Sequence, residues 1–390
     1  MTMVFKNSRR GQVKPFIVMD VMREANLLES RGSEVLHLEV GQPSTSAPDG
    51  VLEAAKRKIK TDRLGYTDAL GIPQLRERIT EHYYEKYGLS LKSDRVVVTT
   101  GSSGGFMLAF LSAFDAGDRV ALATPGYPAY RNILNALDIK TVELPCAADN
   151  GYKITPAVLD RIKMPIDGLI VASPANPTGT MLTADDISAI ASYCDERKIR
   201  LISDEIYHGI TYGLAEKSTL SYTENAFIIN SFSKYYSMTG WRVGWVVVPE
   251  KLLRSVECLA QNIYISVPAI SQHAACVAFD CINELDKNVN RYAVNRDFLL
   301  SELPKIGVDQ IAPADGAFYL YAGVGEFTYN SVDFCRRLLT ETGIALAPGV
   351  DFDPDAGHLS VRISFSGETK TIVEAMSRFG EWVTKLDARI

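Results

Sequence analysis

Lys234 is the residue of this chain best placed to act as a nucleophile. It stands in Ser231-Phe232-Ser233-Lys234, among small hydroxyl residues and directly after a predicted strand at 226–230. A lysine that is partly desolvated has a lowered pKa, so its neutral amine can attack a carbonyl carbon. Arg242 follows eight residues later, past a glycine, and we expect it to return to the same pocket. The alternative is an ordinary surface lysine and surface arginine.

Other polar residues also follow predicted strands. Asn176 lies in a proline-rich segment after the strand predicted at 168–172. Asp204 and Tyr207 follow the strand predicted at 200–203 and are one helical turn apart. Ligands of parallel sheets bind at the carboxyl ends of the strands, so these side chains are candidates for one site. Taken alone, the first segment also fits a simple turn, and the second fits an acidic helix start with Asp204 as its N-cap.

A glycine-rich segment is a candidate anion site. Residues 101–105 are predicted to form a tight turn between a strand at 95–100 and a helix from Phe106 onward. Backbone N–H groups at such a helix start attract a phosphate. The segment fits neither the usual dinucleotide pattern nor the P-loop pattern. It does match G-x-S-x-G, in which Ser103 would be a hydrolase nucleophile, and a turn without a ligand is the third possibility.

These residues require a scaffold in which strands and helices alternate. Strands are predicted at 95–100, 119–123, 140–144, 168–172, 200–203, 226–230 and 242–248. Helices between them are predicted at 103–114, 127–137 and 184–197. Thr183 is the expected N-cap of the last of these helices. Such alternation predicts an α/β fold with a mainly parallel seven-stranded sheet that is flanked by helices.

After about residue 286 the pattern changes, which predicts a smaller α+β domain. The elements expected there are a long helix at 286–303, a strand at 318–321, a helix at 331–342, a strand at 359–365 and a helix from Thr369. The first 45 residues are a poor start for the large sheet. We therefore predict a large domain at 46–286 and a small domain that both chain termini build, from 1–45 and 287–390.

The composition excludes several classes of protein. The 390 residues carry a formal net charge of −6 and are 46% hydrophobic and 23% charged, which is ordinary for a globular protein and argues against a nucleic-acid binder. No apolar stretch reaches the roughly 18 residues of a membrane span, and the N-terminus lacks the apolar core of a secretion signal. The six cysteines form no CxxC pair and the five histidines have no zinc spacing. We therefore predict reduced thiols, a cytoplasmic protein and no metal site.

Six segments, in one order, are similar to the motifs of a known family. They are residues 101–105, Pro125-Gly126-Tyr127-Pro128, Asn176-Pro177-Thr178-Gly179, Asp204-Glu205-Ile206-Tyr207, Ser231-Phe232-Ser233-Lys234 and Arg362. In this order they resemble the class I/II aminotransferases, which are pyridoxal-phosphate enzymes of the aspartate aminotransferase fold (fold type I). The resemblance extends from about Gly41 to Arg362, which is most of the chain. One such motif is weak evidence, whereas six in order are highly specific.

The resemblance implies a role for each residue around the cofactor. Lys234 would form a Schiff base with the aldehyde of pyridoxal 5'-phosphate and would then move a proton at the substrate α-carbon. Asp204 would pair with the pyridine nitrogen and keep it protonated. Tyr207 and Asn176 would hydrogen-bond the phenolic oxygen of the ring, and Tyr127 would stack on the ring face.

The resemblance also implies binding sites for the phosphate and the substrate. The phosphate would be held by Ser102, Ser103, Ser231, Ser233 and Arg242. Arg362 would bind the substrate α-carboxylate through two parallel hydrogen bonds, with Gly41 and Asn176 beside it. Tyr66 matches a family tyrosine that reaches the phosphate of the neighbouring subunit, which implies a homodimer.

The amino donor is predicted to be neutral. Family members that use aspartate bind its second carboxylate with an extra cation. This cation is an arginine where the present chain has Asn262, or a lysine where it has Ser103. Both departures count against a dedicated dicarboxylate enzyme. The hypothesis is therefore an aliphatic or aromatic L-amino acid as donor and a 2-oxo acid as acceptor.

Three alternatives remain open. A pyridoxal-phosphate β-lyase acting on carbon–sulfur bonds would have the same fold and most of these motifs. A serine hydrolase would use Ser103 with a later aspartate and either His273 or His358, but it leaves Lys234 and Arg242 unexplained. A ligand-sensing domain of a transcription regulator would need an appended DNA-binding domain, and the chain before Gly41 is neither long nor basic enough for one.

Overall fold

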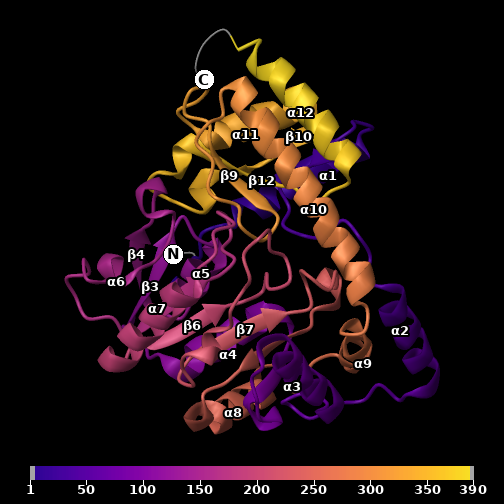
Figure 1. Ribbon diagram of the computed structural model, residues 1–390, viewed down its shortest axis with the longest axis vertical. Helices are drawn as coiled ribbons and strands as arrows, with labels where there is room; N and C mark the ends of the chain where they lie inside the picture. Colours follow the sequence, from indigo (N-terminus) through magenta and orange to yellow (C-terminus); the bar gives the residue numbers. More distant parts are fainter. Residues whose placement is uncertain (1–4, 387–390) are drawn as a thin grey trace.

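The structure is a computed structural model and describes residues 5–386 of the chain. Its main feature is a seven-stranded sheet with the strand order β2-β8-β7-β6-β5-β3-β4, seen in the lower half of Figure 1. Strand β8 runs antiparallel to β2 and β7, and the other neighbours are parallel. The α/β class and the mainly parallel sheet predicted from the sequence are confirmed. The strands are β2 (Val96–Thr99), β3 (Arg119–Thr124), β4 (Lys140–Pro145), β5 (Gly168–Ala172), β6 (Arg200–Asp204), β7 (Phe227–Ser231) and β8 (Gly244–Val247).

Helices cover both faces of this sheet, so its strands are apolar on both sides. Val96 and Val98 of β2 pack into one hydrophobic cluster, and Val97 between them packs into another. This alternation follows from the two-residue repeat of a strand and explains why the strands read as continuous apolar runs. The helices around the sheet are α2 (Asp49–Thr61), α3 (Pro73–Tyr87), α4 (Gly101–Ala113), α5 (Pro128–Ala136), α6 (Pro156–Leu159), α7 (Ala184–Arg197), α8 (Leu253–Ile263) and α9 (Ala269–Ala278).

Helix α7 has the bounds predicted for it, and its start shows why. The Thr183 side chain accepts a hydrogen bond from the Asp186 backbone N–H, and the Asp186 side chain accepts one from the Thr183 backbone N–H. This reciprocal pair is a capping box, which satisfies two N–H groups that a helix start leaves free. The N-cap predicted from the sequence is therefore confirmed.

A second group of elements lies above the sheet in Figure 1 and has its own hydrophobic cluster. Its three-stranded antiparallel sheet has the order β11-β12-β9, and β1 pairs with β10. Long helix α10 leads from the large sheet into this group (Figure 1). The elements are α1 (Ile17–Ser30), β1 (Leu36–His37), α10 (Ile282–Glu302), β9 (Tyr319–Gly323), α11 (Ser331–Thr342), β10 (Ile344–Ala345), β11 (Ala347–Pro348), β12 (Ser360–Ser364) and α12 (Thr369–Val383).

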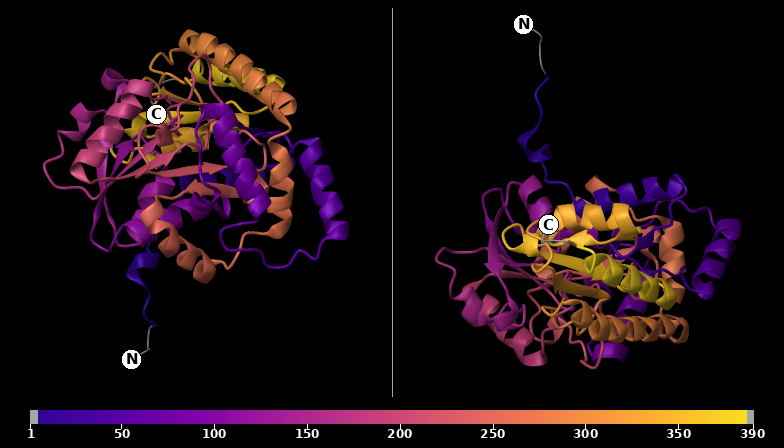
Figure 2. Two further views of the ribbon diagram at one scale, coloured as in Figure 1. Left: turned by 60° about the horizontal axis from the view of Figure 1, so that its bottom comes forward. Right: turned by 90° about the horizontal axis from the view of Figure 1, so that it is seen from above.

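The N-terminal part of the chain belongs with this second group. Val18 of α1 packs with Tyr321 and Phe352, and Ala25 packs with Leu339. Ahead of α1, residues 5–15 are exposed, and this segment extends away from the body of the molecule (Figure 2). Within residues 5–386, no helix has the length and apolar character that a membrane span requires.

Candidate active site

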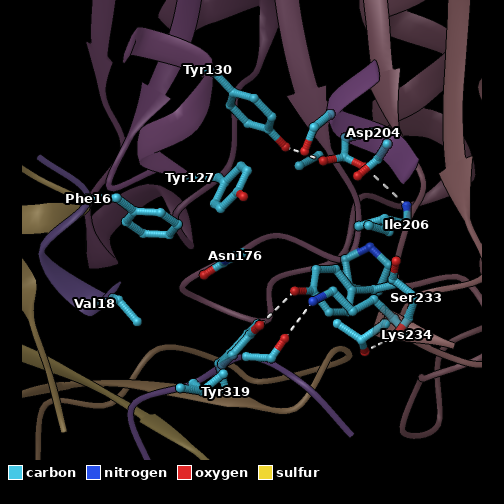
Figure 3. A pocket seen from close by; sticks show the side chains of 18 of the residues that line it. Phe16, Val18, Tyr127, Tyr130, Asn176, Asp204, Ile206, Ser233, Lys234 and Tyr319 are labelled. Carbon is cyan, nitrogen blue, oxygen red and sulfur yellow. Dashed lines mark hydrogen bonds between the residues drawn. The ribbon is translucent and has the colours of Figure 1, made fainter. Parts of the chain in front are cut away.

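One cavity collects most of the side chains that the sequence singles out. It lies where β5, β6 and β7 end, beneath the second group of elements, and its lining includes Asn176, Asp204, Lys234 and Arg362. In Figure 3, Phe16, Val18 and Tyr127 lie on one side of this cavity, and Ser233 and Lys234 lie on the other. The cavity is therefore at the carboxyl edge of the sheet, where ligands of doubly wound folds bind.

Lys234 lies three residues after the end of β7. Its Nζ donates a hydrogen bond to the backbone oxygen of Gly41 at 2.5 Å and lies 5.7 Å from the centre of the Tyr207 ring. Burial of the amine, together with the positive charges of Arg362 and Arg242, lowers the pKa of Lys234 to about 7. A large fraction of the amine is therefore neutral near neutral pH and can act as a nucleophile.

Asp204 ends β6 and is buried in the cavity wall. Its carboxylate accepts hydrogen bonds from the Tyr130 hydroxyl and from the Ile206 backbone N–H, the latter at 3.1 Å. These partners carry no charge, so burial dominates and raises the pKa of Asp204 to about 6, although both donors and Lys234 oppose the shift. No helix follows Asp204, so the alternative reading as a helix N-cap is wrong.

Arg362 of β12 is 2% exposed and is fixed by contacts on several sides. Its Nη1 donates to Oδ1 of Asn176 at 2.9 Å, and its Nη2 donates to the backbone oxygen of Glu39 at 2.5 Å. The rings of Tyr319 and Phe352 lie 4.3 and 4.7 Å from its central carbon. Its Nε is buried without a hydrogen-bond partner. A rigid, buried guanidinium with a free donor is suited to bind a carboxylate.

Tyr207, Tyr319 and Gly41 form the wall between Lys234 and Arg362. The hydroxyls of Tyr207 and Tyr319 are hydrogen-bonded to each other at 2.7 Å. A Cβ atom on Gly41 would lie 1.8 Å from the Tyr319 hydroxyl oxygen. Glycine is therefore required at this position, because the backbone must approach the tyrosine closely.

The glycine-rich segment differs from its prediction. Helix α4 begins at Gly101, so the glycines are the first turns of the helix and not a turn ahead of it. Gly101 has φ +72°, and a Cβ atom there would lie 2.4 Å from Nη2 of Arg242. The absence of a side chain thus lets the guanidinium of Arg242 approach the helix start. Ser102, Ser103 and Arg242 line the cavity together, which retains the predicted anion-binding arrangement.

Most of the predicted cofactor residues line the cavity, but Ser231 and Tyr66 do not. Ser233 lines the cavity, whereas Ser231 lies behind it and donates a hydrogen bond to Oγ of Ser233 at 2.9 Å. Tyr66 is 84% exposed and lies in the loop between α2 and α3. Asn262 is on α8, where its side chain donates to the backbone oxygen of Cys258.

The structure also places residues in the cavity that the sequence reasoning missed. They are Phe16, Val18 and Met19 around the start of α1, Tyr130 of α5 and Tyr319 of β9. A signal existed for Tyr130, since it follows Tyr127 by three residues and so shares its face of a helix. No local pattern indicates the residues around α1, because the side chains that Phe16 and Val18 contact, such as Tyr127 and Phe352, are distant in sequence.

The histidines of the hydrolase alternative lie elsewhere. His273 is 3.5 Å from the carboxylate of Asp62, and His358 contacts the backbone of Asp355. Neither residue lines the cavity that holds Ser103. A nucleophile and its base must be within hydrogen-bond reach, so this geometry does not support a serine hydrolase.

One cavity thus holds an amine with a lowered pKa and a buried guanidinium suited to a carboxylate, an arrangement typical of enzymes that act on small carboxylates. Comparison with known proteins gives the family. Residues 33–379 match the family described as "Aminotransferase class I and II", and the chain belongs to it. Family membership favours transamination over the carbon–sulfur lyase alternative.

Individual relatives agree with this assignment. The chain is 50% identical over 378 residues to a valine–pyruvate aminotransferase from Mycobacterium tuberculosis, covering 96% of this chain and 97% of the relative. A crystal structure of an aminotransferase from the same organism has a TM-score of 0.96 and 49% identity, over 98% of this chain and 100% of that one. Aspartate aminotransferase from Thermus thermophilus with maleate has a TM-score of 0.92 and 28% identity, over 97% and 100% of the two chains.

The protein is therefore a pyridoxal-phosphate-dependent aminotransferase. Its cavity fits this cofactor on three observations. Lys234 has an amine with a lowered pKa. Asp204 is a buried carboxylate whose hydrogen-bond donors are uncharged. Because Gly101 has no side chain, the guanidinium of Arg242 lies close to the start of helix α4. The amine suits the aldehyde of the cofactor, the carboxylate suits its protonated ring nitrogen, and the arginine at the helix start suits its phosphate.

Proposed function

We propose that this aminotransferase takes its amino group from an L-amino acid with a neutral, apolar side chain and passes it to a 2-oxo acid. The observation that carries the proposal is the composition of the cavity wall. Phe16, Val18 and Met19 are apolar, and the cationic side chains that line the cavity, in the described part of the chain, are Lys234, Arg242 and Arg362. A second substrate carboxylate would find no cation beyond the three that the cofactor and the α-carboxylate require.

The similarity to the valine–pyruvate aminotransferase narrows this proposal. Half of the aligned residues are identical, and the alignment covers nearly all of both chains. We take valine as the first candidate donor and pyruvate as the first candidate acceptor. A branched aliphatic side chain suits the apolar wall around the start of α1, because burying its apolar surface against that wall removes the surface from water, which is favourable.

The residues proposed to hold the cofactor form three groups, which would contact its phosphate, its ring and its phenolic oxygen. The phosphate is assigned to the helix start and its neighbours, namely Ser102, Ser103, Ser231, Ser233 and Arg242. We assign Tyr127 to the ring face, Asp204 to the ring nitrogen, and Tyr207 and Asn176 to the phenolic oxygen. When bound, pyridoxal phosphate supplies an aldehyde that condenses with amines and a ring that accepts electrons from the α-carbon.

The protein's own contribution centres on Lys234 and Arg362. We assign Lys234 as the amine that holds the aldehyde in the resting enzyme and, once free, as the base that moves the proton at the substrate α-carbon. Its lowered pKa leaves enough neutral amine for both tasks. Arg362, together with Asn176 and the backbone of Gly41, is assigned to the α-carboxylate and so orients the α-carbon toward Lys234.

We also propose a homodimer in which Tyr66 reaches the phosphate site of the partner. Tyr66 is 84% exposed, which supports this proposal, since so large an exposed aromatic side chain is accessible for contact with a second subunit. Ile59, Ile263 and Ile265 are likewise exposed. Tyr66 and Ile265 lie on adjoining segments, because the Thr67 backbone N–H donates to Oγ of Ser266 at 3.3 Å, and exposed apolar side chains that lie together are typical of subunit interfaces.

Two further proposals concern domain organisation and compartment. We propose a large cofactor-binding domain at 46–286 and a small domain built from 1–45 and 287–390, which the separate hydrophobic clusters support. We propose a cytoplasmic location, because the buried thiols of Cys146, Cys194 and Cys335 suit a reducing compartment.

The test is a comparison of amino donors with pyruvate as acceptor. The purified enzyme, loaded with cofactor, is assayed with valine, alanine, phenylalanine and aspartate, and kcat/KM is measured for each. We expect the neutral donors to exceed aspartate by at least tenfold, since no cation is left for the second carboxylate. A strong preference for aspartate would refute the proposal.

A further inference from the structure

The first turn of α1 and the residue before it form the apolar wall of the cavity. The Phe16 ring meets the Tyr127 ring edge-on, with the ring centres 5.7 Å apart. Val18 is 3% exposed and packs with Tyr321 and Phe352. In Figure 3, Phe16 and Val18 lie across the cavity from Lys234. The position of this turn therefore decides how much room a substrate side chain has.

This turn has no cap of its own. Phe16 is at the N-cap position and has no side-chain group that accepts a hydrogen bond. The segment before it, residues 5–15, is exposed, and the N–H groups of Ile17 and Val18 donate elsewhere than to that segment. The free N–H groups at a helix start need acceptors, which are commonly supplied by a residue next to the helix in sequence.

Asp351, more than three hundred residues away in sequence, supplies these acceptors. The backbone N–H of Ile17 donates to Oδ1 of Asp351 at 3.2 Å, and that of Val18 donates to Oδ2 at 3.0 Å. A carboxylate at a helix N-terminus is also favoured by the helix dipole. Both oxygens of one buried side chain are thus used to hold the start of α1.

Asp351 is itself fixed to the substrate side of the cavity. It is 4% exposed, and its backbone oxygen accepts a hydrogen bond from Nη2 of Arg131 at 3.1 Å. The next residue, Phe352, places its ring 4.7 Å from the central carbon of Arg362 and accepts a hydrogen bond from Gly126, beside Tyr127. One short segment therefore connects the apolar wall with the arginine proposed to bind the α-carboxylate.

We propose that Asp351 is a positioning residue that sets donor selectivity. It holds the turn at residues 16–19 at a fixed place relative to Arg362, so the space left for the donor side chain is constant. The inference rests on the proposed function, because it takes Arg362 as the carboxylate site and the wall as the side-chain site. Asp351 does not line the cavity, so its effect is exerted through Phe16, Val18 and Met19, which do.

The experiment uses the cofactor-loaded enzyme and three variants. Asp351→Ala removes both acceptors, and Asp351→Asn keeps one carbonyl oxygen. Thr183→Ala removes the cap of α7 and serves as the matched control for a lost helix cap on another element. Two quantities are measured for each protein: hydrogen exchange of the peptide that contains Ile17 and Val18, and the ratio of kcat/KM for valine to that for alanine.

We expect exchange of the Ile17–Val18 peptide to be at least tenfold faster in Asp351→Ala, and the valine-to-alanine ratio to move about tenfold toward one. Asp351→Asn should lie between the wild type and Asp351→Ala, and Thr183→Ala should alter neither quantity. Absorbance of the bound cofactor should be the same in all proteins. An equal loss for valine and alanine, or an unchanged ratio with faster exchange, would overturn the proposal.

A fourth variant covers the case that Asp351→Ala does not fold. Phe16→Ala removes a side chain from the wall without touching the cap, and it should shift the valine-to-alanine ratio in the same direction. If Phe16→Ala leaves the ratio unchanged, the wall does not set selectivity and the proposal fails. Failure of the proposed function is distinguishable, because it would appear in the wild type as a preference for aspartate, while hydrogen exchange still reports the contact of Asp351.

Discussion

The hydroxyl of Tyr130 donates a hydrogen bond to Oδ2 of Asp204, and both side chains are buried at the end of β6. Tyr130 is held in place by the Phe106 ring, whose centre is 4.9 Å from its own. Burial raises the pKa of Asp204, and the hydrogen bond from Tyr130 opposes this rise and favours the ionised carboxylate. The ionised form is the one that pairs with a protonated ring nitrogen.

Tyr130→Phe is therefore expected to weaken cofactor binding. The variant removes a hydrogen bond to a charged group, worth about 1.5–3 kcal/mol, so the dissociation constant of pyridoxal phosphate should rise by about ten- to a hundredfold. The measurement is a fluorescence titration of the cofactor-free protein. Tyr83→Phe, which removes a buried hydroxyl bonded to Trp245, is the control and should bind the cofactor as the wild type does.

Lys234→Ala should remove both the covalent attachment of the cofactor and the catalytic base. Turnover of the neutral donor should fall by more than about a thousandfold, because general base catalysis alone contributes about 10²–10⁴. The visible absorption band of the lysine-bound cofactor should be lost as well. The exposed Lys56, which pairs with Glu53, serves as a control through Lys56→Ala. Full turnover in Lys234→Ala would contradict the assignment of Lys234.

Arg362→Lys should weaken binding of the substrate far more than binding of the cofactor. Lysine cannot form two parallel hydrogen bonds with a carboxylate, and it loses the stacking on Tyr319 and Phe352. We expect KM for the amino donor to rise by about a hundredfold, with the cofactor dissociation constant changed by less than about threefold. Steady-state kinetics and the cofactor titration check the two parts separately. An unchanged KM would refute the role of Arg362.

The lowered pKa of Lys234 predicts how stability depends on pH in the cofactor-free protein. The pKa falls from 10.5 to about 7, so between these values the unfolded state binds a proton that the folded state has released. Stability must rise with pH over this range. Relative to Lys234→Met, the wild type should therefore gain free energy of unfolding as the pH increases from about 7 to about 10. Urea unfolding at several pH values measures this difference, and a flat difference would contradict the prediction.

Tyr66→Phe tests the proposed dimer. Analytical ultracentrifugation of the wild type should give twice the mass of one chain, and the variant should remain a dimer because it loses only a hydroxyl. Cofactor binding should weaken by about tenfold, which corresponds to the loss of one hydrogen bond to a phosphate. Tyr84→Phe, at another exposed tyrosine, should have no effect. A monomeric wild type that binds the cofactor normally would refute the role of Tyr66.

Much of the scaffold follows from local sequence. The run at 168–172 is bounded by turn residues and apolar throughout, and it forms β5 with those bounds. Thr183 and Asp186 determine the start of α7 through their reciprocal hydrogen bonds. The structure of the glycine-rich segment could not be predicted in this way, because local propensity favours a turn at 101–105. The helix forms there because the glycines allow Arg242 and the neighbouring strands to approach closely, which only packing reveals.

The candidate residues for chemistry could be predicted from local sequence. Lys234, Asp204 and Asn176 follow strands, and the direction of parallel strands brings such positions to one edge of a sheet. The surroundings of these residues could be seen only in the folded structure. The contacts of Asp351 with Ile17 and Val18, and of Tyr130 with Asp204, join distant segments whose spacing encodes no period or motif. Such contacts arise when separate elements pack against each other, so the shape of the substrate cavity is a property of the folded chain.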